Sequence, residues 1–181
     1  MLKCYLDTET TGVEIGACVI EIAAILVEDG QIIDTFHEFM RPYRPVHPSA
    51  FKAHGISDEF LADKPEEKDV LSNFMEWFVG MGDVKQILAY NAQFDIRIIN
   101  DRIMRDFLSD EPFLDKNIVI DVAVLAKQAI RDGLIPKNGR KWSQEYVAGC
   151  LGITYDAHSA IEDVKAMMRI HEKITKLYEV K

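Results

Sequence analysis

The sequence predicts an α/β fold, in which a three-strand antiparallel meander is followed by alternating strands and helices. Two observations indicate this fold. Apolar runs of strand character come first, before residue 42, and from residue 66 onward helical patterns alternate with two brief apolar runs. Strands of a meander pair antiparallel, whereas strands separated by helices pair in parallel, so we expect a mixed five-stranded sheet with helices packed on it.

The meander comes from two stretches of the chain. A short strand is predicted over residues 2–7, and the segment ACVIEIAAILVEDGQIIDTFHEFMRP (17–42) holds two longer strands. Asp29 and Gly30 stand between these two strands. Both residue types tolerate the positive φ of a type I′ turn, so the sequence predicts a tight hairpin there.

The elements after the meander alternate in type. Pro42 stops strand pairing, and PSAFKAHGIS (48–57) predicts a short helical turn that ends at Gly55. The spacing of apolar residues then predicts a helix over 66–80, a strand over 85–90, a helix from about Asn91, a strand over 117–121, helices over 122–132 and 142–152, and a last amphipathic helix over 160–178.

The composition is that of an ordinary globular protein. The chain has 181 residues, 48% of them apolar, so we expect a single domain over residues 1–181. Cys4, Cys18 and Cys150 are scattered without a CxxC pair, which argues for reduced thiols and against a disulfide framework or a zinc site. No signal peptide or membrane span is apparent, so we expect a cytoplasmic protein.

The charge restricts the class of partner. With 21 basic and 30 acidic residues, the formal net charge is −9, which works against a broad electrostatic grip on a long duplex. A nucleic acid held at one end by metal ions is still compatible with this charge, because divalent cations invert the local field.

Two carboxylates stand at the end of the first strand, in YLDTETTG (5–12). Alternation along a strand points Asp7 and Glu9 to the same side, and open sheets form ligand crevices at strand ends. Neighbouring carboxylates repel each other unless a positive charge lies between them, which favours a bound cation. The alternative is a solvated turn or a helix cap.

A third acid follows the fourth predicted strand, in AYNAQFD (89–95). With Asn91 as the cap of the next helix, Asp95 lies in the first turns, near the positive end of the helix dipole. It is therefore either a site residue or an acid that complements the dipole.

The segment AHSAIEDV (157–164) combines a histidine with a fourth acid. Ser159 and Glu162 fit a capping box, in which His158 precedes the cap and Asp163 is the fourth residue of the helix. Because these two positions approach each other at a helix start, we expect the imidazole to lie beside the Asp163 carboxylate.

The four acids and the histidine together point to phosphoryl chemistry. Carboxylate oxygens without a nearby cysteine suit hard cations, Mg²⁺ or Mn²⁺. Two such ions about 3.5–4 Å apart can stabilise both the attacking and the leaving oxygen of an in-line displacement. Asp7 is the best candidate to bridge them, and histidine serves as a general base near neutral pH.

These residues carry a resemblance to a known family. DTETTG, NAQFD and HSAIED resemble, in order, the three motifs of the DEDDh, or DnaQ-like, 3′→5′ exonucleases. HGISDEFLADKP (54–65) also resembles a segment of the proofreading epsilon subunits of bacterial replicative DNA polymerases. The resemblance implies an RNase H-like fold, a single exonuclease domain, and stepwise hydrolysis of single strands from the 3′ end to nucleoside 5′-monophosphates.

The resemblance also implies roles for single residues. Asp7, Glu9 and Asp163 would ligate the ion that activates water. Asp7 would also contact the second ion, which Asp95 would hold largely through water, and His158 would be the general base. The terminal nucleotide would be bound by the loop after the first acids and by two further residues, which gives the set Thr10, Thr11, Gly12, His54 and Phe94.

Substrate and partners stay open at this point. Single-stranded DNA is favoured, but an RNA-trimming enzyme similar to RNase T or oligoribonuclease would share every catalytic residue. A non-catalytic module that binds nucleic-acid ends and a small-nucleotide phosphodiesterase are the alternatives from other classes. The sequence ends at LYEVK without the tail of a polymerase subunit, so a free-standing nuclease is expected, with a polymerase partner still possible.

Several further residues receive no role. Tyr90 stands where relatives often have histidine, outside the five catalytic positions. Trp77 and Trp142 fit packing better than base stacking, and Asp121 fits a helix cap. The basic run KNGRK (137–141) is typical of a solvated loop, and His37 has no acidic partner at metal-ligand spacing.

Overall fold

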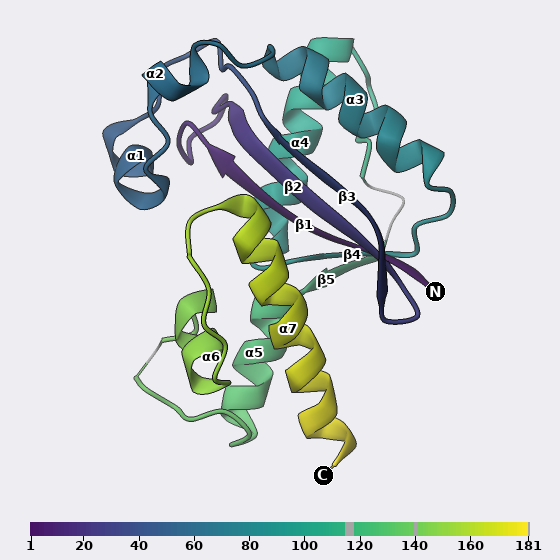
Figure 1. Ribbon diagram of the computed structural model, residues 1–181, viewed down its shortest axis with the longest axis vertical. Coiled ribbons are helices and arrows are strands. Elements are labelled where there is room, and N and C mark those ends of the chain that lie inside the picture. The colour runs from purple at the N-terminus through teal and green to yellow at the C-terminus, as the bar shows by residue number, and fades with distance from the viewer. Residues whose placement is uncertain (115–117, 140, 181) are drawn as a thin grey trace.

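The computed structural model describes residues 1–114, 118–139 and 141–180, and its strands form one sheet in the order β3-β2-β1-β4-β5 (Figure 1). Strand β1 pairs antiparallel with β2, and β2 with β3, whereas β1 pairs in parallel with β4, and β4 with β5. The mixed five-stranded sheet is therefore confirmed. Its strands are β1 (Leu2–Thr10), β2 (Val19–Glu28), β3 (Gln31–Phe39), β4 (Gln86–Ala89) and β5 (Ile118–Asp121).

The hairpin turn forms as predicted. Asp29 and Gly30 have φ angles of 50° and 83°, the pair of positive values that a type I′ turn needs. Strand β1 is longer than predicted and continues to Thr10, because Thr8 and Thr10 stay paired with β2. A shift of register follows Glu9, so the strand is irregular where it carries the acids.

The predicted helices are confirmed within a few residues at their ends. Helix α2 was not predicted, because a four-residue helix has no periodicity to detect; the Ser57 hydroxyl caps it by accepting from the Phe60 N–H at 3.2 Å. Residue 117 of the predicted fifth strand lies outside the described residues. The helices are α1 (Pro48–His54), α2 (Asp58–Leu61), α3 (Glu67–Gly80), α4 (Ala92–Phe107), α5 (Val122–Arg131), α6 (Gln144–Cys150) and α7 (Ala160–Glu179).

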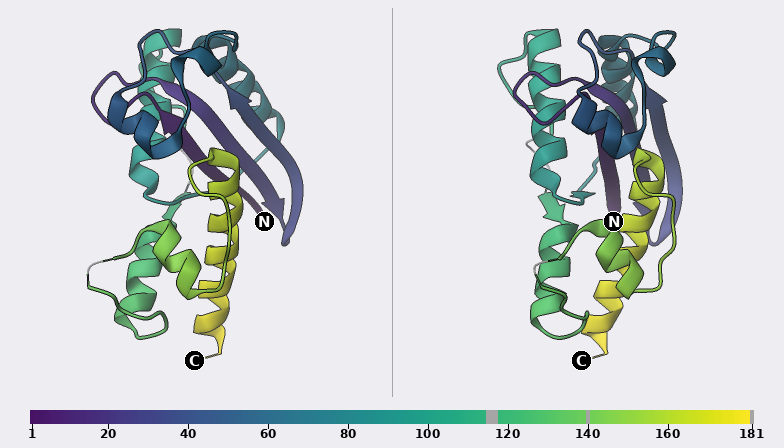
Figure 2. Two further views of the ribbon diagram at one scale, coloured as in Figure 1. Left: turned by 60° about the vertical axis from the view of Figure 1, so that its left-hand side comes forward. Right: turned by 90° about the vertical axis from the view of Figure 1, so that its left-hand side faces the viewer.

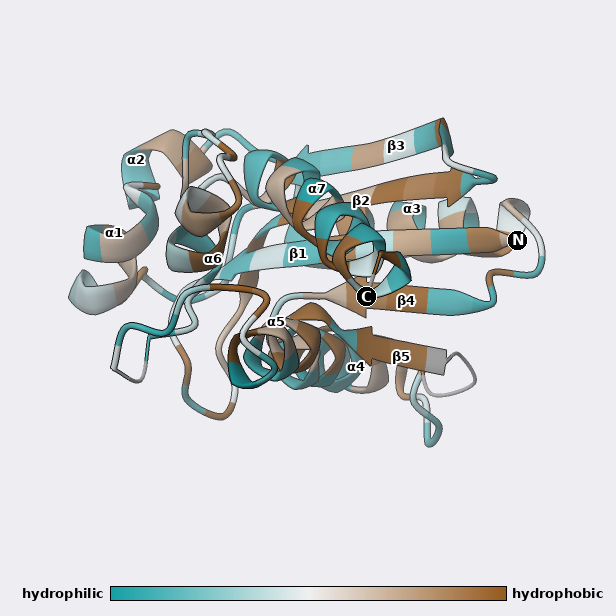
Figure 3. Ribbon diagram, turned by 90° about the horizontal axis from the view of Figure 1, so that it is seen from below, coloured by the Kyte–Doolittle hydropathy of each residue, from teal (hydrophilic) through white to brown (hydrophobic). Residues whose placement is uncertain are grey.

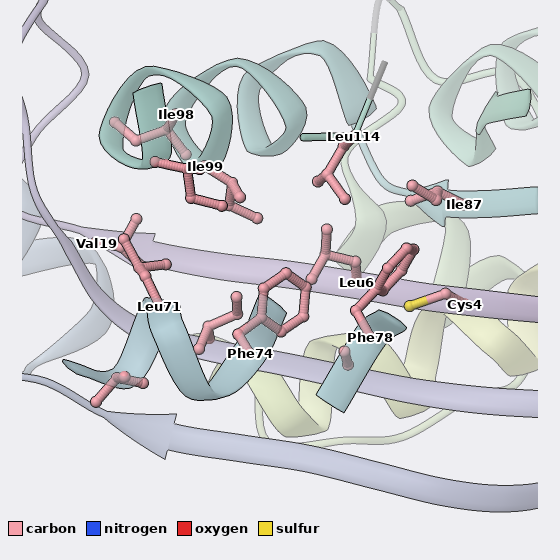
Figure 4. Close-up of a cluster of buried hydrophobic side chains, with 14 of the residues drawn as sticks. Cys4, Leu6, Val19, Leu71, Phe74, Phe78, Ile87, Ile98, Ile99 and Leu114 are labelled. Atoms are coloured by element: carbon pink, nitrogen blue, oxygen red, sulfur yellow. The ribbon is translucent and has the colours of Figure 1, made fainter. Parts of the chain in front are cut away.

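Helices α3 and α4 cover one face of the sheet. Leu71 and Phe74 of α3 meet Ile98 and Ile99 of α4 over Leu6 of β1, and all five side chains are at most 1% exposed (Figure 4). Burial of these apolar side chains holds α4 against β1.

Helices α5, α6 and α7 cover the opposite face, so that β1 lies between α4 and α7 (Figure 2). Tyr5, Ile25 and Leu88 point to this face and pack with Val164 and Ile170 of α7. Strand β2 is covered on both sides, which explains its nearly continuous apolar sequence (Figure 3).

The predictions for the cysteines and for Trp77 are confirmed. Cys4, Cys18 and Cys150 are free thiols. Trp77 packs against Phe74 and donates its indole N–H to Asp34 at 2.9 Å. Across the described ranges, no helix is both long and apolar enough to cross a membrane.

Candidate active site

The alternation of β1 directs its acids toward α7. Leu6 belongs to the core on the α4 side and Tyr5 to the core on the α7 side, so Asp7 and Glu9 share the face of Tyr5. Thr8 points the other way, toward α4. The strand thus carries two acids on one face and a hydrogen-bonding residue between them on the other.

Three acids converge where α7 begins. One carboxylate oxygen each from Asp7, Glu9 and Asp163 lies within 4.8 Å of the others. Asp163 is in the first turn of α7, which crosses the sheet at this point (Figure 1). These three residues can hold a divalent cation, and we call them the acid cluster.

Asp95 reaches the same region from α4. It lies in the first turn of that helix, as predicted, and is 3% exposed. Its Oδ1 accepts hydrogen bonds from the Thr8 N–H at 3.0 Å and the Thr8 hydroxyl at 2.7 Å, which ties α4 to β1. Its charge also acts on Asp7, although Asp95 is not one of the three residues of the acid cluster.

The acids strongly perturb one another. Burial, and then repulsion from neighbouring acids, raises the pKa of Glu9 to about 8 and that of Asp7 well above its usual range. Burial likewise raises the pKa of Asp95 to about 7 and raises the pKa of Asp163. Negative charge is therefore costly here without a cation, and a bound divalent ion would favour the ionised carboxylates.

The turn before α7 brings His158 and Asp163 together through the backbone. His158 has a φ of 74°, and its N–H donates to Asp163 Oδ2 at 2.9 Å. Its imidazole Nε2 lies 3.4 Å from Glu145 Oε1 of α6, and the side chain is 53% exposed. The predicted proximity thus involves the main chain of His158, whereas the ring contacts a residue that was not predicted.

The predicted capping box is wrong. Ser159 precedes α7 but makes no side-chain capping bond; its hydroxyl instead donates to Glu21 Oε1 at 3.4 Å. Glu162 accepts from Lys165 at 2.7 Å. Asp163, and not Glu162, supplies the carboxylate that accepts from the turn before α7. The bond of Ser159 to Glu21 and the bond of the His158 N–H to Asp163 thus replace the capping box.

Asn91 stands at the N-cap of α4, as predicted, but its side chain makes no capping bond, whereas the predicted Asp121 cap is confirmed in full. Asn91 is in the left-handed region with a φ of 67° and makes no side-chain capping bond. Asp121 Oδ1 accepts from the Ala123 N–H at 2.9 Å, which caps α5, and also from the Asn91 N–H at 3.0 Å. One acid therefore joins the starts of α4 and α5.

The predicted substrate loop is tightly bonded internally. The Thr10 hydroxyl donates to the Gly12 carbonyl at 2.7 Å, and the Thr11 hydroxyl accepts from the Cys18 N–H at 2.9 Å. His54 Nε2 lies 3.2 Å from the Thr10 carbonyl oxygen, and burial lowers the pKa of His54. The loop directly after Glu9 is thus connected by hydrogen bonds to Cys18, and His54 of α1 lies beside it.

Phe94 is placed beside Asp95 at the start of α4. It is half-buried, and the Arg97 guanidinium lies 5.5 Å from its ring centre. The ring thus stands on the same short segment as the fourth acid, separate from the loop of Thr10 and His54.

Sequence reasoning missed Gln144 on α6. Its Nε2 donates to both the carbonyl and the Oδ1 of Asp163, each at 2.9 Å. Glu145, the next residue, contacts the His158 ring. No local pattern indicates either contact, because the partners are at least 13 positions apart in the chain.

Sequence reasoning also missed Glu21, a fifth acid beside the cluster. It lies opposite Glu9 in the register of β1 and β2 and is 0% exposed. Oε1 lies 2.7 Å from His37 Nε2, so His37 has an acidic partner that was not predicted, and Oε1 also accepts from the Ser159 hydroxyl. Oε2 is buried with no partner among the described residues. A lone acid inside the apolar run VIEIAAIL was the signal that could have identified it.

Comparison with known proteins connects this geometry to nucleases. The model of the RNase_T family, described as "Exonuclease", matches residues 4–171. The chain is 30% identical over 183 residues to the DNA polymerase III subunit epsilon of Pasteurella multocida, covering 96% of this chain and 68% of that protein. It is 43% identical over 101 residues to the same subunit of Escherichia coli K12, covering 52% and 40%.

Solved structures agree with this match. Exonuclease X in complex with 5′ overhanging duplex DNA is 27% identical with a TM-score of 0.66, covering 96% of this chain and 91% of that one. E. coli Exonuclease I with a dT13 oligonucleotide has a TM-score of 0.82 at 21% identity, covering 99% and 43%. The nuclease domain of 3′hExo, a DEDDh family member bound to rAMP, has a TM-score of 0.73 at 20% identity, covering 97% and 92%.

Proposed function

The chain belongs to the exonuclease family, in its DEDDh or DnaQ-like group, and from this membership we propose that it hydrolyses single-stranded nucleic acid from the 3′ end. DNA is the favoured substrate and nucleoside 5′-monophosphates are the products. The observation that carries the proposal is the convergence of Asp7, Glu9 and Asp163 from two distant parts of the chain.

The acid cluster fits a divalent cation. Its three members are carboxylates whose oxygens lie close together, and burial and mutual repulsion raise their pKa values. Two ions, Mg²⁺ or Mn²⁺, would activate the attacking water and neutralise charge on the phosphodiester. We propose that Asp7, Glu9 and Asp163 hold one ion, and that Asp7 and Asp95 hold the other, Asp95 through water.

His158 is proposed as the general base. Its ring is half exposed and stands on the turn that Asp163 holds through the His158 N–H. The imidazole would accept the proton of the attacking water at Nε2, and Glu145 lies where it would stabilise the resulting imidazolium.

The terminal nucleotide is proposed to bind over the loop that follows Glu9. Thr10, Thr11 and Gly12 would present backbone groups from a connected turn, with His54 beside them. Phe94 would pack against the sugar or base from the side of Asp95. The other enzymatic candidate, an RNA-trimming exoribonuclease, uses the same acids, so the test includes both sugars.

Relatives named as subunits of DNA polymerase III indicate a class of partner. We propose that this chain can bind a DNA polymerase and act there in proofreading. We also propose that residues 1–181 act as one exonuclease domain, since the family match extends over residues 4–171.

The test is a time course on labelled oligonucleotides. DNA and RNA 12-mers, labelled at the 5′ or the 3′ end, are incubated with Mg²⁺, Mn²⁺ or a chelator. We expect the 3′ label to leave at once as a mononucleotide, the 5′-labelled strand to shorten stepwise, and the chelator to stop both. Early release of the 5′ label, or turnover in chelator, would contradict the proposal.

A further inference from the structure

An exposed tryptophan stands on an anchored segment next to the proposed active site. Trp142 is 41% exposed, so it lies at the surface and not in either core. Its carbonyl oxygen accepts a hydrogen bond from the Tyr90 hydroxyl, and the Tyr146 hydroxyl donates to the Pro136 carbonyl at 2.7 Å. The backbone around the indole is therefore held in place while the ring faces solvent.

The indole shares a hollow with residues of the site. Trp142 and Glu145 line one open hollow of about 640 Å³, and Glu145 Oε1 is 3.4 Å from His158 Nε2. Gln144, between them in the chain, holds Asp163. The hollow thus contains the carboxylate that lies beside the ring of the proposed general base.

Positive charge surrounds this ring in an otherwise acidic protein. The Lys127 Nζ lies 4.8 Å from the centre of the indole ring, and Lys141 lines the same hollow. In a chain of net charge −9, these two lysines outnumber Glu145, the one acid that lines the hollow. Residue 140, in the basic run noted in the sequence, lies outside the described residues.

We propose that Lys127, Lys141 and Trp142 form a binding surface for single-stranded nucleic acid upstream of the 3′-terminal nucleotide. A base stacks on the indole, and the two ammonium groups pair with neighbouring phosphates. Such stacking changes affinity by about five- to 160-fold per base. The proposal rests on the proposed function, because that function supplies the strand and its direction.

The chemistry favours a single strand over a duplex. Bases inside a duplex are stacked on one another, and their faces are covered, whereas an unpaired base offers its whole face to an aromatic side chain. Lysines recognise phosphates regardless of base, so we expect a surface without strong sequence preference.

The first experiment measures binding without turnover. The chain has two tryptophans, so Trp77→Phe leaves Trp142 as its sole indole reporter. In chelator, we expect a thymidine 12-mer to quench the fluorescence of this variant saturably, and Lys141→Glu added to it to weaken binding at least fivefold. Absence of quenching, or equal quenching by a blunt duplex of the same length, would overturn the surface as proposed.

The second experiment separates this surface from the active site itself. Rates are compared for a thymidine 12-mer and for the p-nitrophenyl ester of thymidine 5′-monophosphate, which has no upstream nucleotide. We expect Trp142→Ala to raise KM for the 12-mer at least fivefold and to leave the ester within twofold of wild type, with Trp142→Phe close to wild type on both.

The outcomes distinguish two kinds of failure. Equal losses on both substrates would mean that Trp142 only supports α6, and no loss on either would mean that the strand passes elsewhere; both overturn this inference. A wild-type protein that hydrolyses neither substrate with Mg²⁺ would instead overturn the proposed function, and the fluorescence titration would still decide the binding surface.

Discussion

Individual side chains at the site depend on one another for their charge state. Glu9, with a pKa raised to about 8, lies between Asp7 on its own strand, Glu21 opposite and Asp163 on α7. Each added negative charge makes the next more costly, so a cation stabilises the whole group at once. Charge at these residues is therefore a property of the cluster.

Asp7→Asn is expected to abolish turnover and to raise the melting temperature in chelator. The amide keeps the shape of the side chain but removes the charge that repels Glu9 and Asp163. Asp121→Asn is the matched control, because Asp121 is an acid at a strand end that caps α5. Mononucleotide release and thermal melting check both effects; normal release by Asp7→Asn would remove the basis of the proposed mechanism.

His158→Ala is expected to reduce single-turnover rates by about 10²–10⁴-fold while the 3′ end still binds. The ring contributes a proton acceptor, whereas the bond to Asp163 uses the backbone N–H, which alanine retains. A binding titration beside rapid-quench kinetics separates the two contributions. Weaker binding with an unchanged chemical step would argue against the base role.

At the scale of elements, α6 acts as a support for the start of α7. Gln144 donates a hydrogen bond to Asp163, and the Glu145 carboxylate lies 3.4 Å from the His158 ring, so one seven-residue helix contacts both residues. Figure 1 shows α6 beside α7 on the face away from α4. On the other side, Glu21 of β2 holds Ser159. The turn before α7 is therefore fixed from two elements.

Gln144→Ala is expected to lower metal affinity or kcat by about 10–100-fold, the usual cost of removing a group that orients a metal ligand. Both of its hydrogen bonds go to Asp163. Gln128→Ala on α5 is the control, because the side-chain hydrogen bonds that the structure describes for Gln128 go to the exposed residues Arg131 and Asp132, away from the acid cluster. Calorimetric titration with Mn²⁺ and steady-state kinetics provide the two measurements, and equal behaviour of the two variants would refute a positioning role.

At the scale of the whole molecule, the acids at the active site oppose the stability that the two apolar layers provide. Without a bound cation, the pKa of Glu9 is about 8 and that of Asp95 is about 7 in the folded protein. In the unfolded chain both carboxyls ionise near their ordinary pKa values of about 4. Between these limits the folded state binds more protons, so these groups contribute stability at low pH that is lost as the pH rises through 7 to 8.

The stabilisation by Mg²⁺ is therefore expected to grow with pH. Binding needs the ionised carboxylates, so more protons must be displaced at pH 6 than at pH 8.5. At 100 times Kd the gain is about 2.7 kcal/mol, or about 5–10 °C in melting temperature for a protein of this size. Melting curves with Mg²⁺ and with chelator at both pH values check this. A shift of equal size at both would show that the acids are already ionised in the metal-free protein.

The sequence by itself determined the elements and most of the candidate site. Local periodicity and turn chemistry, which act within a few residues, predict three features: the succession of strands and helices along the chain, the Asp29-Gly30 hairpin, and the shared face of Asp7 and Glu9. The convergence of Asp163 with the β1 acids came from family resemblance, and the structure places these acids together.

Only the tertiary structure decided what surrounds these residues. The Ser159 hydroxyl donates to Glu21, 138 residues away, and does not make the predicted capping bond. Gln144 and Glu145 contact the start of α7 from a separate helix. Trp142 lies at the surface, and the Tyr90 hydroxyl from a distant part of the chain donates to its carbonyl oxygen. Side-chain partners far apart in the chain are chosen by packing between layers, and no local pattern encodes that choice.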